Sequence, residues 1–265
     1  MNFPLFRYSC KRAFPLWLVF TALMCAYTFA VVRMYDPVAG AALTELAASL
    51  PQTMTVLGMA SYDNTFTAFI VNYLYGMLML ALPMLFTILL STQLMARHIA
   101  RGTMCYLLAS PNSRKTIAAT QRNVLLFYLF LMLALCCGAT VVLCEYFYPG
   151  QLAVRHFLLL TACVFALQLA LASVCFFFSC KCSGTGRAMT CSAAACLLFY
   201  TLRLLANLGG PLEYLRYVTP YTLLDPAGIL QSDLRACLLP LVLLVLAVAL
   251  FALASRTFRK RTMPF

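Results

Sequence analysis

Residues 124–143 read VLLFYLFLMLALCCGATVVL, a run of twenty residues without a charged side chain. A transmembrane helix needs about 20 consecutive apolar residues to cross a hydrocarbon core roughly 30 Å thick. This run therefore predicts a membrane-spanning helix. Five further segments of similar character bring the number of predicted spans to six, and these are 15–32, 66–90, 157–178, 188–206 and 236–254.

The composition of the whole chain supports the same conclusion. Of its 265 residues, 64% are hydrophobic and 10% are charged, whereas soluble domains are about half apolar and about a quarter charged. We therefore exclude an ordinary soluble domain and predict an all-α polytopic membrane protein with a single transmembrane domain over residues 1–265. Pro83 should kink the second span, while Pro15 and Pro240 fall in first turns, where a missing N–H costs little. No clean cleavage site follows the first apolar run, so we expect an uncleaved first helix rather than a signal peptide.

The distribution of charge between the loops predicts the orientation. With both termini placed inside, most of the 19 lysines and arginines fall on the inner side, and all seven acidic residues fall outside. Because cytoplasmic loops carry an excess of Lys and Arg, we predict a multi-pass protein with both termini in the cytosol. The net charge of +12 then reflects topology beside membrane lipid, and we expect no nucleic-acid partner.

Three stretches outside the spans predict short interfacial elements. An N-terminal apolar stripe opposite basic residues is typical of an amphipathic interfacial helix. The stripe consists of Phe3, Phe6, Cys10 and Phe14. On the outer side, apolar residues at helical spacing within 43–58 indicate one or two short amphipathic helices, and the Gly- and Pro-rich stretch 209–230 indicates a short re-entrant or interfacial element.

The sequence carries no motif for covalent chemistry or ATP hydrolysis. It contains no nucleophile elbow, no H-E-x-x-H pair and no phosphate-binding G-x-x-x-x-G-K-[ST] loop. Cys180 and Cys182 form a C-x-C pair, but a metal site would need further ligands nearby and none is visible, so we predict no metal. We expect that the chain is not an enzyme and binds no cofactor of its own.

No predicted span carries a charge near its centre, where proton- and ion-coupled carriers usually place one. Arg203 comes nearest, but it lies about one helical turn from the outer end of its span and can snorkel to the surface. The spans therefore form a pathway or scaffold that takes its energy or signal from elsewhere. A partner protein at the basic inner surface is the natural source.

A polar, punctuated stretch joins the second and third spans, and residues 97–115 there read RHIARGTMCYLLASPNSRK. A helix over its first half separates two faces at about 100° per residue. Ile99, Thr103, Tyr106 and Leu107 share one face, and Arg97, Arg101, Met104 and Leu108 share another. One face can pack beneath the spans while the other presents two arginines to a partner. In the alternative interpretation, these arginines only hold the topology and bind lipid phosphate.

The segment 101–114 resembles the cytoplasmic loop after the second span of bacterial ABC-exporter permeases of the type-2 class. Those permeases carry E-G-T and then L-x-x-L-L-[ST]-x-P-x-S-R. The matching residues are Gly102, Thr103, Leu107, Leu108, Ser110, Pro111, Ser113 and Arg114. In addition, 48–59 resembles the outer L-P-x-x-x-x-x-x-G element of this family, and 219–230 resembles its P-[FY]-x-x-x-[DN]-P-x-x-[IL]-L element. With six spans, these motifs cover nearly the whole chain in the right order.

The resemblance implies a permease subunit of an ATP-driven exporter in the bacterial cytoplasmic membrane. Such a subunit pairs with a second permease, either a copy or a paralogue, and with two cytosolic ATPase subunits that bind ATP and Mg²⁺. The loop would form a short coupling helix in a groove of the ATPase, with Arg97, Arg101 and Met104 at the contact beside the matching residues. The family usually carries glutamates where this chain has Arg101 and Cys105. If the contact is kept, the cognate groove should be more acidic than usual.

The resemblance also implies a central path lined by the second and fifth spans of two subunits. The polar candidates for this path are Asn72, Tyr73, Tyr200, Arg203 and Asn207. In the first span, Ala22, Ala26 and Ala30 recur at a spacing that lets membrane helices approach closely, either as a subunit seam or as internal packing. An ion-coupled carrier, an intramembrane enzyme and a non-transport sensor or anchor stay open as alternatives, and the cargo is not specified.

Overall fold

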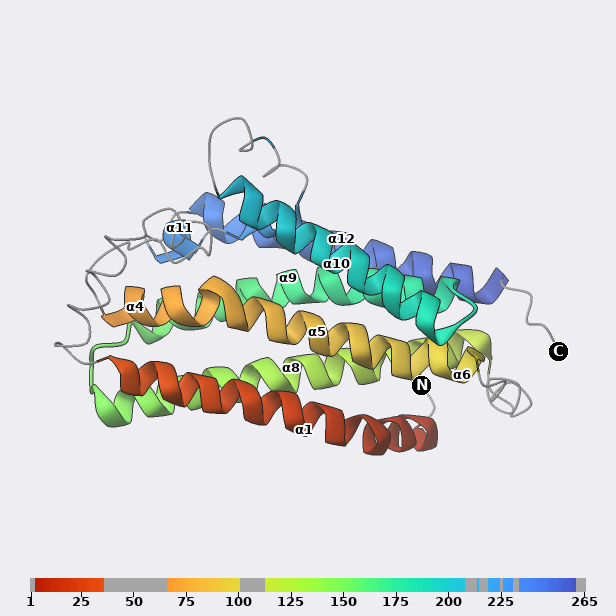
Figure 1. Cartoon of the computed structure of the whole chain (residues 1–265), viewed down its shortest axis with the longest axis horizontal. Helices are drawn as coiled ribbons and strands as arrows, with labels where there is room; N and C mark the ends of the chain where they lie inside the picture. The colour runs from red at the N-terminus through yellow and green to blue at the C-terminus, as the bar shows by residue number, and fades with distance from the viewer. Residues whose placement is uncertain are drawn as a thin grey trace.

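The computed structural model describes residues 3–35, 66–100, 113–207, 214, 219–224, 226–230 and 234–260. Within these ranges the chain is helical nearly throughout and contains no strand. Six helical segments are long and apolar enough to cross a membrane, and they lie side by side as one bundle (Figure 1). The prediction of an all-α chain with six helices long and apolar enough to span a membrane is therefore confirmed for the described residues.

The second span is a chain of helical segments, whereas the other five spans are single helices. The single helices are α1 (Phe3–Met34), α8 (Arg114–Phe147), α9 (Val154–Lys181), α10 (Thr185–Ala206) and α12 (Leu234–Lys260). The second span runs through α4 (Phe66–Tyr73), η1 (Leu74–Leu78), α5 (Met79–Ser91), η2 (Thr92–Ala96) and α6 (Arg97–Ala100). Two short elements precede α12, namely η4 (Pro220–Leu223) and α11 (Pro226–Leu230).

The N-terminal region differs from its prediction. Residues 3–34 form one helix that passes through Pro15, so no separate amphipathic helix precedes the first span. The predicted apolar stripe only partly coincides with the packed face. Phe6 and Cys10 pack against the core, Phe3 and Phe14 are exposed, and the most buried positions are Leu5, Ser9 and Ala13. The neighbouring helix decides the face, since α1 packs lengthwise against α8. Pro15 and Pro240 accordingly lie inside their helices rather than in the first turns.

The centre of the bundle is formed by α9 and the second span. α9 packs against α5, α8, α10 and α12, whereas α1 lies outside, against α8 and α5. The second span is the most buried of the six, while α1, α10 and α12 leave most of their residues outside the core. Large apolar side chains that face outward, such as Val245 and Val248 of α12, suit a hydrocarbon solvent, in which burial is not required.

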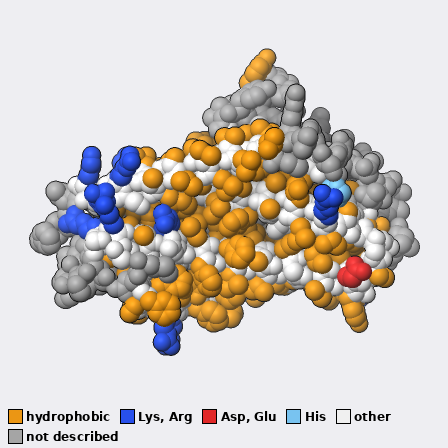
Figure 2. Space-filling view, turned by 180° about the vertical axis from the view of Figure 1, so that it is seen from behind, with side chains coloured by type: hydrophobic (Ala, Val, Ile, Leu, Met, Phe, Trp, Pro, Cys, Tyr) orange, Lys and Arg blue, Asp and Glu red, His pale blue; other side chains and the backbone are white. Residues whose placement is uncertain are grey.

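The charges divide between the two ends of the bundle. Lysines and arginines gather at the end where α1 begins and where α9 and α12 finish, which we call the basic end (Figure 2). The opposite, distal end carries Glu145, the one acidic residue within the described ranges. Arg33, Arg155 and Arg203 also lie toward the distal end. Within the described ranges, this separation follows the charge asymmetry predicted from the loops.

The second span is irregular on both sides of Pro83. The segments η1 and η2 are π-helical, and such wide turns are rare in proteins and frequent at functional sites. Pro83 lies in α5 between them and has no N–H to donate to the preceding turn. On the neighbouring helix, the buried Gln168 donates from Nε2 to the Leu80 carbonyl (2.9 Å). A hydrogen bond from α9 therefore supports the span next to its interrupted turn.

An aromatic cluster ties the distal ends of three helices together. The Tyr35 ring packs edge-on against Phe66 (4.6 Å between centroids) and against Tyr148 (5.2 Å). The Thr67 hydroxyl donates to the Gln151 carbonyl (3.2 Å) and accepts from the Ala153 N–H (3.1 Å). The start of the second span is thus fixed to α1 and to the turn between α8 and α9.

Candidate functional site

An arginine–tyrosine cluster lies at the distal end, between α10, α5 and η4. The Arg203 guanidinium lies over the Tyr221 ring, 5.4 Å from its centre. The Tyr200 ring meets the same ring edge-on, with 5.9 Å between centroids. The Tyr221 hydroxyl donates to Sδ of Met84 on α5 (3.6 Å). Tyr221 therefore inserts from the segment before α12 and joins the second and fifth spans.

The electrostatics of this cluster favour binding over catalysis. Burial raises the pKa of the Tyr221 phenol, so the ring stays neutral and offers its face to the Arg203 cation. The buried Tyr200 hydroxyl has no hydrogen-bond partner among the described residues. A ligand that satisfied this hydroxyl would remove the penalty of an unpaired buried group. The cluster can thus hold a polar or anionic group, but it contains no activated nucleophile.

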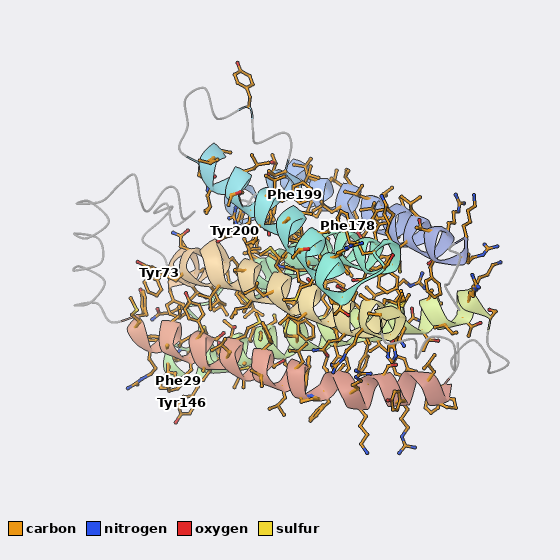
Figure 3. All side chains as sticks on the ribbon, turned by 45° about the vertical axis from the view of Figure 1, so that its right-hand side comes forward. Phe29, Tyr73, Tyr146, Phe178, Phe199 and Tyr200 are labelled. Atoms are coloured by element: carbon orange, nitrogen blue, oxygen red, sulfur yellow. The ribbon has the colours of Figure 1, made fainter. Side chains whose placement is uncertain are left out.

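The five predicted path residues do not form one group. Tyr200 and Arg203 share the cluster described above, but Tyr73 stacks on Phe69 (4.6 Å), and its carbonyl accepts a hydrogen bond from the Tyr27 hydroxyl of α1 (2.8 Å). Figure 3 shows Tyr73 and Tyr200 on separate helices. Asn72 is half-buried beside Tyr73, and Asn207 is exposed at the end of α10.

Sequence reasoning missed Tyr221, the residue that connects Tyr200 with Arg203. Its only signal was the tyrosine that follows Pro220 in the motif before the last span. That motif identifies a family element, but it does not say that the ring enters the core of the bundle. The structure places Tyr221 in η4 and buries it against α5 and α10.

A line of small polar side chains continues from the middle of the bundle toward the basic end. Ser179 of α9 donates to Oγ of Ser91 on α5 (3.4 Å). Ser192 of α10 donates to the Cys175 carbonyl (3.4 Å), and the thiols of Cys175 and Cys196 lie 3.4 Å apart. All five side chains are buried. Small hydroxyls and thiols let membrane helices approach closely and bond to one another, so this line holds α5, α9 and α10 together.

Most of the predicted coupling helix lies outside the described residues, which end at Ala100 and resume at Ser113. The predicted docking residues in that gap are Arg101, Gly102, Thr103, Met104, Leu107, Leu108, Ser110 and Pro111. The predicted interfacial helices within 43–58 are also outside the described residues. The remaining predicted docking residues, Arg97, Ser113 and Arg114, border the gap on both sides.

Both flanks of this gap contact other spans. Next to Arg97, Nε2 of His98 accepts a hydrogen bond from the Arg12 guanidinium of α1 (3.4 Å). On the other side, Oγ of Ser113 accepts from the Thr116 N–H (3.2 Å) and so caps the start of α8. The Arg114 guanidinium donates to the Arg259 carbonyl of α12 (3.4 Å). These contacts join the described flanks of the gap to α1 and α12.

The alanine repeat of α1 faces away from the bundle. Ala22, Ala26 and Ala30 are exposed, whereas Met24 and Thr28 of the same helix are buried. The repeat is therefore not used for packing between the described helices. Its alternative use, as a seam with another subunit, stays a prediction.

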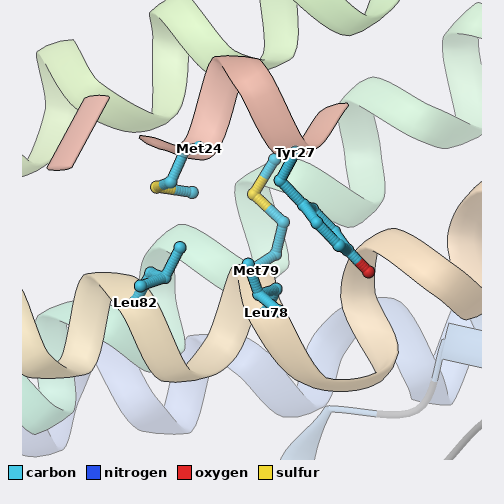
Figure 4. Close-up of a pocket in the computed structure, with 5 residues that line it drawn as sticks. All are labelled: Met24, Tyr27, Leu78, Met79 and Leu82. Carbon is cyan, nitrogen blue, oxygen red and sulfur yellow. The ribbon is translucent and has the colours of Figure 1, made fainter. Parts of the chain in front are cut away.

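Neither a metal centre nor the crevice beside α1 offers a binding site among the described residues. Among the residues that the structure describes, no group of three or more His, Cys, Asp or Glu side chains could hold a metal ion. A crevice between α1 and the second span has no room for a water molecule and is a gap in packing (Figure 4). Its lining residues are Met24, Tyr27, Leu78, Met79 and Leu82.

Comparison with known proteins adds no assignment. The chain matches no protein-family model, and it matches no curated protein. The similarity of 101–114 to the coupling loop of type-2 ABC permeases therefore rests on the motifs in the sequence.

Proposed function

We propose that the chain is the permease subunit of an ATP-driven exporter of the ABC type-2 class, with its basic end in the cytosol. It would form the translocation path with a second permease and would be driven by separate ATPase subunits that bind ATP and Mg²⁺. The observation that carries the proposal is the sequence motif of 101–114, which follows the second span along the chain. The described residues on either side of 101–112 lie at the basic end, and they contact α1 and α12.

The contacts at these flanks supply a route for mechanical coupling. A partner that moves the stretch would act on α6 and α8 directly, and it would act on α1 through Arg12 and on α12 through Arg259. The second span has wide turns at η1 and η2, where a bend distorts fewer regular hydrogen bonds. Movement at the basic end could thus reach the distal end through the span that contacts Tyr221 at Met84.

In this proposal, the arginine–tyrosine cluster belongs to the distal end of the path. Arg203 supplies a positive charge, and Tyr200 supplies a buried hydroxyl without a described partner. The remaining buried residues are mostly apolar, and their polar groups are mainly small hydroxyls and thiols together with the amides of Gln121 and Gln168. No charged coupling residue is buried in the middle of the described spans, which favours an external energy source over ion coupling.

The test is ATP hydrolysis by the complex purified from its native membrane through a tag on this chain. We expect that hydrolysis co-purifies and that Arg101→Glu reduces the recovered activity by about tenfold at low salt, because a charge reversal at a docking site is strongly unfavourable. Arg187→Glu is the control, since Arg187 is exposed at the basic end but lies in the first turn of α10, away from 101–112 in the sequence. Transport driven by a proton gradient in the absence of ATP would refute the proposal.

A further inference from the structure

A groove runs along the outside of the bundle between α8 and α9, in the half nearer the distal end. Its volume is about 530 Å³, and its walls are almost entirely apolar. Gly138 forms part of the α8 wall, and nothing lies within 4 Å of the position that a Cβ would take there. The Phe130 and Phe165 rings meet edge-on, 5.7 Å apart, at the end of the groove nearer the middle of the bundle.

The length of the groove matches one leaflet of a bilayer. Its α9 wall extends from Val154 to Phe165, which at 1.5 Å per residue corresponds to about 16 Å. The hydrocarbon core is roughly 30 Å thick, so one leaflet contributes about half of that thickness. A transmembrane helix of a partner protein would need a groove along the full span, whereas this one stops at the aromatic pair. An acyl chain needs only the depth of a single leaflet.

The groove ends at Val154 on α9, and the next residue along the helix is an arginine. Arg155 lies in the first turn of α9, next to the lining residue Val154, and is exposed. No described side chain forms an ion pair or hydrogen bond with it. The distal end carries basic and acidic side chains at the border of a continuous apolar surface (Figure 2). Arginine binds phosphate groups in a bidentate geometry, so the end of the groove suits a lipid headgroup.

We propose that this groove binds an acyl chain of an anionic diacyl phospholipid, with the headgroup phosphate on Arg155. The site is independent of the energy source of the protein, so it stands apart from the exporter proposal. One residue that lines the groove also contacts the second span. Thr161 lines the groove, and its hydroxyl lies 2.6 Å from the Tyr75 hydroxyl in the wide turn η1. A bound acyl chain would therefore press on the residue that links α9 to that turn.

The test measures fluorescence quenching by phospholipids with brominated acyl chains in reconstituted bilayers. Trp17 is the only tryptophan of the chain, so Trp17→Phe provides a silent background for a single reporter. Val142→Trp places the reporter on the rim of the groove, where Val142 is 67% exposed. Leu241→Trp is the control on the lipid-facing surface of α12, where Leu241 is 52% exposed.

We compare the quenching by brominated phosphatidylglycerol with the quenching by brominated phosphatidylcholine. Each brominated lipid is mixed either with its own unbrominated form or with the other lipid, so that the two lipids compete for the groove. One arginine at a membrane surface favours an anionic lipid by about 1 kcal/mol, which corresponds to about fivefold in relative affinity. The rim reporter should show this preference, and the α12 reporter should show none. Arg155→Gln should abolish the preference, and Gly138→Leu, which fills the groove, should make the rim reporter behave like the control.

Three results would overturn the proposal. The rim and control reporters could respond alike to both lipids, which would leave only bulk lipid contact. The preference could survive Arg155→Gln, which would place the headgroup elsewhere. The rim reporter could be shielded from both brominated lipids, which would mean that a partner helix covers the groove. The two variants act at different positions, so misfolding of one leaves the other decisive.

Discussion

Two buried glutamines provide a matched test of the polar contacts inside the bundle. Gln168 donates from Nε2 to the Leu80 carbonyl beside Pro83 (2.9 Å). The side-chain amide of Gln121 has no partner at either atom among the described residues. The same substitution, Gln→Leu, should therefore destabilise the protein at position 168 and stabilise it at position 121.

The magnitudes follow from the environment of each amide. Hydrogen bonds between membrane helices contribute about 0.6 kcal/mol on average and at most about 1.7 kcal/mol. Leucine has a volume similar to that of glutamine, so neither variant should open a large cavity. Oε1 of Gln168 has no described partner, so removing this buried oxygen offsets part of the cost of losing the hydrogen bond. We therefore expect Gln168→Leu to destabilise the protein by about 0.5–1 kcal/mol. Burying an amide without a hydrogen bond costs about 1–3 kcal/mol in proteins, so Gln121→Leu should stabilise by about 1 kcal/mol or more.

The assay is thermal and denaturant unfolding in detergent micelles, followed with a thiol-reactive dye. Most of the free cysteines in the described part of the chain are buried, so the dye reacts when the bundle opens. Shifts of the same sign for both variants would refute the reasoning. A destabilised Gln121→Leu would specifically mean that its amide has a polar partner in the folded assembly.

Three further predictions concern single contacts. Tyr75→Phe and Thr161→Val should each destabilise the bundle. A double-mutant cycle should give a coupling energy of about 0.5–1.5 kcal/mol between the two hydroxyls. Additive effects of the two substitutions would contradict the 2.6 Å contact. Arg203→Leu should lower the unfolding free energy by about 0.5–2 kcal/mol through loss of its contact with an aromatic ring, and Arg203→Lys should restore part of that loss in the same unfolding assay. Arg12→Gln should lower the ATPase activity of the purified complex several-fold while the unfolding midpoint stays near that of the parent; unchanged activity would show that the contact with His98 transmits nothing.

The six spans could be predicted because one physical requirement dominates their sequence. A segment that crosses hydrocarbon must be apolar for about 20 residues, and this holds whatever the helix packs against. The helix ends were harder, because hydropathy reports the thickness of the membrane rather than the length of the helix. α1 therefore begins at Phe3 instead of residue 15, and it carries its basic residues on a continuous helix.

The internal contacts were largely beyond sequence reasoning. In a membrane protein, outward-facing residues are as apolar as buried ones, so the pattern of hydrophobicity gives little information on which face packs. The predicted apolar stripe of α1 accordingly coincided with the packed face only at Phe6 and Cys10, and the contact of Ser91 with Ser179 went unnoticed. Tyr221 was missed for a different reason, because a residue between spans carries no periodic signal that it will enter the core.

The central claim, that the stretch 101–112 docks on an ATPase, is tested most directly by site-specific photo-crosslinking in native membranes. A photoreactive residue replaces Met104 within this stretch. The control carries the photoreactive residue in place of Tyr146, which is 79% exposed at the distal end. We predict an adduct with an ATP-binding subunit from position 104 only, and its loss when Arg101→Glu is added at low salt. An adduct from neither position, or equal adducts from both, would contradict the account.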